Sequence, residues 1–187
     1  MHIPDHCMFW ATCTLGYFGF LRAAELTVPS LASFSPLIHL TVLDIAVDAP
    51  SSPSCMHDKI KASKTDPFRK GFDIHIDIGH HPLCAVQAMM AYLSQRGSSP
   101  GPLFCLQDGR PLSRGLLTQW LRQIMAAAGI AGNFSSHSFR IGDATVAACN
   151  GIPDHLIQAL AWWTSNAYQL YVWTPSEALA SLSLQLS

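Results

Sequence analysis

The chain has few charged residues. Of its 187 residues only 12% are Asp, Glu, Lys or Arg, about half the usual share, and the net charge is −1. No lysine or arginine follows Arg140. Neutralising phosphate groups normally takes a basic surface, so any nucleic-acid binding has to come from a local cluster of cations.

Cysteine pairs with metal-ligand spacing are also missing. None of the six cysteines forms a CxxC pair, which argues against a zinc site and favours buried, reduced thiols of an intracellular protein. His80 and His81, with Asp77 nearby, are better interpreted as a solvated loop, because adjacent residues of a strand point to opposite faces. The sequence therefore predicts no metal and no cofactor.

Long apolar runs are absent too. The longest uncharged apolar stretch, Cys7 to Leu21, is 15 residues long, whereas a membrane span needs about 20. The start of the chain, MHIPDHC, lacks the basic region of a signal peptide. We therefore expect a buried core helix here and no membrane partner.

Apolar periodicity and turn residues predict a single domain over 1–187 of class α+β, mainly α, with a small antiparallel sheet of about three strands. Strands are expected at 38–48, 56–64 and 72–78, the last two joined by turn residues. Helical segments are expected at 5–21, 22–26, 83–96, 113–128, 136–150, 153–162, 165–173 and 176–185.

A histidine, an arginine and a tyrosine point to phosphoryl transfer. His137 and Arg140 share one helical face, and Tyr171 follows Trp163 by eight positions. Phosphoryl transfer to a tyrosine needs a cationic fork for the phosphate, a donor or proton carrier beside it, and a phenol in line.

Seven phrases, in order, connect these residues to a known family. They are GYFGFLRAAELT, IKASKTDPFRKG, AYLSQRG with GPLF, DGRPLSR, HSFRIGDAT, GIPDHLIQAL and AYQLYVWTPSEALAS, and they run from about residue 8 to 181. The chain resembles the catalytic domain of tyrosine recombinases, the integrase-like and Cre-like DNA breaking-rejoining enzymes. It has a particular likeness to recombinases of eukaryotic DIRS-type retrotransposons.

The resemblance implies a role for each residue of the phosphate site. Arg22 and Arg140 are expected to clamp the non-bridging oxygens, and His137 to bond the phosphate or take the tyrosine proton. Trp163 stands at a position that can donate its indole N–H to a phosphate oxygen. Glu25 matches an acidic position that orients the basic residues.

The resemblance also implies the covalent chemistry. Tyr171 is the expected nucleophile, with Tyr168 one helical turn earlier as its rival. Lys64 is the expected general acid for the leaving 5′ oxygen, and Lys61 is the fallback. The intermediate is a 3′-phosphotyrosyl DNA, which conserves the phosphodiester energy without ATP or a metal.

Double-stranded DNA is the implied partner, in the nucleus and within a mobile element, and no small-molecule substrate is expected. The family exchanges strands as a tetramer, and the C-terminal helix is a candidate for docking on a neighbouring copy. The expected DNA contacts are the basic cluster within residues 59–70, namely Lys59, Lys61, Arg69 and Lys70.

Three positions depart from the family's pattern. Trp162 and Trp173 stand where relatives carry arginine, and Asp143 stands where they carry a small residue. Asp143 is three residues after Arg140, so we expect it to pair with that arginine and compete with phosphate. These departures predict a weakened enzyme. The family's separate N-terminal DNA-clamping domain is expected to be absent.

Two other interpretations stay open at this point. A type IB topoisomerase-like activity uses the same chemistry but rejoins the original partner. A noncatalytic DNA-binding module, or a degenerate transposon relic, keeps the fold and loses the reaction.

Overall fold

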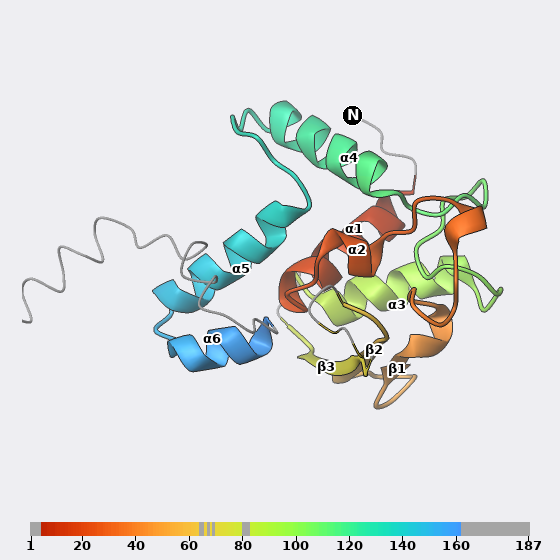
Figure 1. Ribbon diagram of the computed structural model, residues 1–187, viewed down its shortest axis with the longest axis horizontal. Helices are drawn as coiled ribbons and strands as arrows, with labels where there is room; N and C mark the ends of the chain where they lie inside the picture. The colour runs from red at the N-terminus through yellow and green to blue at the C-terminus, as the bar shows by residue number, and fades with distance from the viewer. Residues whose placement is uncertain (1–4, 64–65, 67, 69, 80–82, 162–187) are drawn as a thin grey trace, which may run out of the picture.

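The computed structural model describes residues 5–63, 66, 68, 70–79 and 83–161. Two α-helices and two short 3-10 turns come first, three consecutive strands follow, and helices alone make up the rest (Figure 1). The helices are α1 (His6–Phe18), α2 (Ala23–Leu26), α3 (Ala85–Arg96), α4 (Arg114–Ala127), α5 (His137–Cys149) and α6 (Asp154–Leu160), and the strands are β1 (Ile45–Val47), β2 (Cys55–Ile60) and β3 (Phe72–Asp77).

Helix α1 forms the centre of the fold. It carries no Asp, Glu, Lys or Arg and is buried on most of its surface, so it packs on several neighbours at once. It contacts α3 along one side and α5 along another. Phe9 also meets Trp120 of α4 edge to face, with ring centroids 5.7 Å apart.

The three strands form one antiparallel sheet in the order β1-β2-β3. Side chains alternate between its faces. Met56, Ile60, Ile74 and Ile76 point inward and join the core. The outward face carries the register pairs Cys55↔Asp77, His57↔His75 and Lys59↔Asp73.

The strand expected at 38–48 is largely wrong. Residues Val42–Asp44 form a 3-10 turn, and only Ile45–Val47 is a strand. Asp44 Oδ2 accepts hydrogen bonds from the Thr41 backbone N–H at 2.8 Å and from Thr41 Oγ1 at 2.7 Å. This local capping bond winds the chain where alternation alone predicts an extended segment.

The remaining expectations differ from the structure mainly at element ends. The second strand ends at Ile60 rather than residue 64. The helices expected within the described part of the chain are all present, with ends moved by a few residues. Those expected at 165–173 and 176–185 lie outside the described residues.

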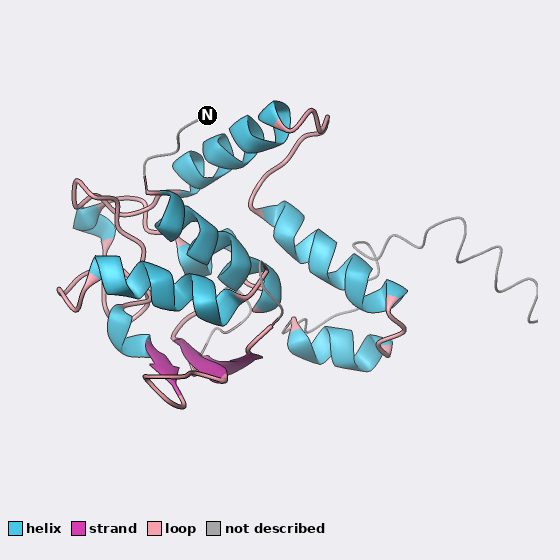
Figure 2. Cartoon of the chain, turned by 180° about the vertical axis from the view of Figure 1, so that it is seen from behind, coloured by secondary structure: helices cyan, strands magenta, loops and turns pink. Residues whose placement is uncertain are grey.

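Helices α5 and α6 pack together at one end of the molecule (Figures 1 and 2). Their contact is a small second core of Ala144, Ala147 and Ile157, against which Phe20 packs. Among the described residues, no helix is long and apolar enough to span a bilayer.

Candidate active site

A strained corner after α1 positions the first arginine. Gly19 follows the helix, and a Cβ there would lie 2.8 Å from the Leu15 carbonyl oxygen, so only glycine fits. Phe20 then adopts a left-handed backbone with φ of 52°, which is unfavourable for a bulky residue. Such strain persists only where surrounding contacts hold it, and it fixes the exit toward Arg22.

Arg22 is held by a carboxylate and a hydroxyl. Its Nη1 donates to Glu25 Oε1 at 3.1 Å and to Ser63 Oγ at 2.7 Å, and its backbone N–H donates to Glu25 Oε2 at 2.7 Å. The Glu25 side chain is 2% exposed and that of Arg22 is 20% exposed. The geometry therefore fits an orienting carboxylate with an arginine that still reaches solvent.

Ser63 is a member of this cluster that the sequence did not reveal. Its Oγ donates to Glu25 Oε1 at 2.7 Å while accepting from Arg22, which joins the exit of β2 to the start of α2. A serine between two lysines matches no recognisable motif. Its bond joins residues 41 apart in sequence, so no local spacing reveals it. Ser63 directly precedes Lys64, which lies outside the described residues.

Arg140 lies deeper than Arg22 and joins three segments. It is 2% exposed. Its Nη1 donates to the Phe20 carbonyl and its Nη2 to the Ala161 carbonyl, both at 2.7 Å. The strained corner after α1 and the end of α6 are thus tied to α5 through one guanidinium. Ala161 is the last described residue before Trp162.

The expected pairing of Asp143 with Arg140 is wrong. Asp143 is 4% exposed, and neither of its carboxylate oxygens accepts a hydrogen bond from the described residues. Burial raises the pKa of Asp143 to about 9, although the charge of Arg140 opposes the shift. The carboxyl is therefore neutral at pH 7. Arg140 does not turn back to position i+3 because its guanidinium reaches beyond its own helix.

The positive charges of three arginines act on the His137 imidazole. It is the first residue of α5. Partial burial lowers its pKa, and the positive charges of Arg140, Arg114 and Arg22 lower it further. Residues from three parts of the chain thus act on one imidazole, which is mostly neutral at pH 7.

Arg114 is a further cation that sequence reasoning did not assign. It is exposed and begins α4. A cation in the first turn opposes the helix dipole, because the N-terminal end already carries partial positive charge. That unfavourable placement is a sequence signal for an anion-binding position.

The basic cluster is only partly described. Lys61 is held in the fold: its Nζ donates to the Pro36 carbonyl at 2.7 Å and pairs with Asp44 at 2.5 Å. Lys59 is exposed on β2, and Lys70 is exposed beyond it. Among the predicted site residues, Lys64, Arg69, Trp163, Tyr168 and Tyr171 lie outside the described residues.

Comparison with known proteins identifies the family. Residues 54–173 match the phage integrase family, which is well over half of the chain. The chain belongs to the phage integrase family. No curated protein matches it.

Solved structures with the same fold are recombinases and integrases. XerH site-specific recombinase bound to its palindromic difH substrate is 17% identical, with a TM-score of 0.70 over 98% of this chain and 47% of that one. XerA recombinase is 20% identical, with a TM-score of 0.67 over 97% and 57%. The Tn1549 transposon integrase in complex with circular intermediate DNA is 12% identical, with a TM-score of 0.57 over 94% and 57%.

These likenesses confirm the predicted fold class. The chain has the mainly helical fold with a three-stranded antiparallel sheet of a tyrosine recombinase catalytic domain. It spans about half the length of the solved structures that it matches.

Proposed function

We propose that this phage integrase family member catalyses site-specific recombination of double-stranded DNA as a tyrosine recombinase. The observation that carries the proposal is the meeting of two arginines at the corner after α1: Arg22 is oriented by Glu25 and Ser63, and Arg140 donates to the carbonyl of Phe20, two residues before Arg22. Two arginines at one place suit a phosphodiester whose non-bridging oxygens gain negative charge during attack.

The proposed reaction is a transfer of one phosphoryl group. The Tyr171 phenolate attacks phosphorus, a bond from phosphorus to the tyrosine oxygen forms, and the bond to the 5′ oxygen breaks. Lys64 gives the leaving oxygen its proton, and His137 receives the proton of the phenol. The 3′-phosphotyrosyl bond keeps the energy needed for rejoining.

Arg22 and Arg140 have different hydrogen-bond partners in this structure. The side-chain bonds of Arg22 to Glu25 and Ser63 use Nη1 alone. Arg140 already donates from both terminal nitrogens to backbone carbonyls. A guanidinium carries five N–H donors, so the two carbonyl bonds do not by themselves prevent Arg140 from also contacting a phosphate.

The finer features of the family also belong to this proposal. Lys59 and Lys70 would contact the DNA backbone, and four copies would assemble on DNA through their C-terminal helices. A nuclear location and a place in a mobile element of the DIRS type follow from the resemblance in sequence. Trp162 and Trp173 remain the positions that predict a weakened enzyme.

A nicked suicide DNA substrate tests the reaction. We expect a covalent protein–DNA adduct on a denaturing gel, absent in Tyr171→Phe and retained in the matched control Tyr168→Phe. An adduct lost only in Tyr168→Phe would reassign the nucleophile.

The low charge of the chain beyond Arg140 favours one alternative, a noncatalytic DNA-binding module. That alternative predicts salt-sensitive DNA binding without any adduct. Rejoining only to the original partner strand would instead indicate topoisomerase-like activity.

A further inference from the structure

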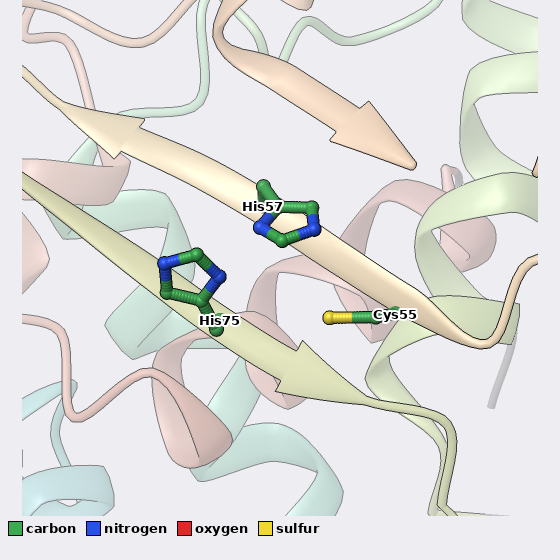
Figure 3. A group of neighbouring side chains, drawn as sticks. All are labelled: Cys55, His57 and His75. Carbon is green, nitrogen blue, oxygen red and sulfur yellow. The ribbon is translucent and has the colours of Figure 1, made fainter. Parts of the chain in front are cut away.

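Three side chains that commonly ligate metals gather on the outward face of the sheet. Cys55 and His57 lie on β2, and His75 lies on β3 (Figure 3). One ligand atom from each lies within 4.8 Å of those from the other two. The two imidazole rings meet edge to face, with centroids 4.4 Å apart.

Strand pairing explains this cluster. Residues i and i+2 of a strand share a face, and antiparallel partners lie directly opposite each other. His57 therefore stands opposite His75, and Cys55 stands opposite Asp77. The sequences CMH and HID thus form a square of one thiol, two imidazoles and one carboxylate across two strands.

The charges around the square favour a cation. The Cys55 thiol hydrogen-bonds Asp77, and the negative charges of Asp77 and Asp48 act on it. Two carboxylates near a thiol create a negative field that attracts a divalent cation.

The neighbouring backbone is already organised. Asp48 Oδ1 accepts hydrogen bonds from the backbone N–H groups of Ser54 at 2.9 Å and Cys55 at 3.0 Å, which fixes the turn before β2. On the other side of His57, β1 places Ala46, whose methyl group is too small to cover the imidazole.

The ligand atoms of Cys55, His57 and His75 have to move closer together to share one ion. In a tetrahedral zinc site the ligand atoms lie about 3.3 to 3.6 Å apart, as follows from bond lengths of about 2.0 Å to nitrogen and about 2.3 Å to sulfur. His75 is exposed, and Cys55 and His57 are only partly buried, so side-chain rotation can close the gap.

We propose that Cys55, His57 and His75, with Asp77 as fourth ligand, bind a late transition-metal ion such as Zn²⁺ and staple β2 to β3. Mixed thiolate and imidazole donors suit such an ion better than Mg²⁺ or Ca²⁺. The prediction of no metal rested on the absence of CxxC pairs, whereas here strand pairing supplies the proximity. In the binding step the Cys55 thiol releases one proton as the sulfur–metal bond forms.

Metal titration of the reduced full chain tests the proposal. With Zn²⁺ alone, calorimetry should show one ion per chain, and saturation should raise the melting temperature. With Co²⁺ alone, we expect a thiolate-to-cobalt charge-transfer band that disappears in Cys55→Ser. His57→Ala and His75→Ala should each weaken Zn²⁺ binding by about tenfold or more, and Asp77→Asn by less.

Matched controls separate this site from other donors. Cys149→Ser and His155→Ala change exposed residues of the α5–α6 region and should leave affinity unchanged. Equal Zn²⁺ affinity in the wild type and in Cys55→Ser, His57→Ala and His75→Ala would overturn the proposal. So would loss of binding in a His80→Ala, His81→Ala double variant when these three single variants still bind. Melting curves without metal verify that each variant folds, and Gln replaces Ala where it does not.

Discussion

The two arginines of the candidate site are held by different kinds of partner. Arg22 bonds a carboxylate and a hydroxyl, and a fifth of its side chain is exposed, at 20%. Arg140 is 2% exposed and donates to two backbone carbonyls that lie 120 and 21 residues away in sequence. The first is oriented by neighbouring side chains, and the second is part of the framework.

This difference fits our proposal that one arginine is oriented for a ligand, whereas the other holds parts of the fold together. A side-chain partner such as Glu25 sets the direction of Arg22 without fixing where the backbone lies. Carbonyl partners do the reverse, because Arg140 connects the ends of α1 and α6 to α5. The core between α5 and α6 is small, so the hydrogen bonds of Arg140 matter more for holding these two helices on the rest of the fold.

Two further carboxyl groups, those of Asp58 and Asp143, are buried away from the arginines' side-chain partners. Asp58 is 1% exposed on the inward face of the sheet, and Asp143 is 4% exposed on α5. Neither carboxylate accepts a hydrogen bond from the described residues. Burial raises the pKa of Asp58 to about 7 and that of Asp143 to about 9.

The largest expected effect comes from removing the framework arginine. Arg140→Ala leaves two carbonyls without their donors and should lower the free energy of unfolding by about 3 to 5 kcal/mol, measured by urea denaturation. Arg22→Ala leaves Glu25 with its Ser63 partner and should cost about 1 to 2 kcal/mol. An equal loss of unfolding free energy in the two variants would contradict the idea that Arg140, and not Arg22, is part of the framework.

The two buried carboxyl groups should destabilise the fold in different pH windows. Each has a folded pKa above its ordinary value, so its contribution to stability is complete below pH 4 and is lost as the pH rises to the folded pKa. For Asp58 the loss runs to about pH 7, and for Asp143 it runs to about pH 9. The slope is at most about 1.4 kcal/mol per pH unit for each group.

Asparagine variants isolate these windows. Relative to the wild type, Asp58→Asn should gain stability between pH 4 and 7 and then reach a plateau. Asp143→Asn should continue to gain stability up to about pH 9. Urea denaturation at several pH values measures both differences, and subtracting the wild type cancels other titrations. A flat difference for Asp143→Asn between pH 7 and 9 contradicts its raised pKa.

The smallest expected effect concerns phosphate binding. Asp143 is neutral at pH 7, so Asp143→Asn should change DNA affinity there by less than about twofold. At pH 9.5 the wild type should bind more weakly than the variant, because the carboxylate then opposes the phosphate. Fluorescence anisotropy of a labelled duplex at low salt measures both, with Asp154→Asn as control. A large gain at pH 7 would restore the idea of a competing charge.

Much of the fold was predictable, and the errors have physical causes. Helices α3 to α6 follow from apolar spacing and from caps such as Ser113, whose Oγ accepts the Leu116 backbone N–H at 3.2 Å. The long first strand was wrong because Asp44 caps a turn at Thr41. Arg22 and Glu25 were recognisable from their motif, but Ser63 was not.

The sequence by itself indicated the family, the order of the helices and the identity of Arg22 and Arg140, because these depend on local pattern and on phrases read along the chain. Only the tertiary structure decided what each charge meets. Burial makes Asp143 neutral, long-range bonds join Arg22 to Ser63 and Arg140 to Phe20, and strand register brings Cys55, His57 and His75 together. Desolvation and distance are properties of the folded chain, and no spacing along the sequence contains them.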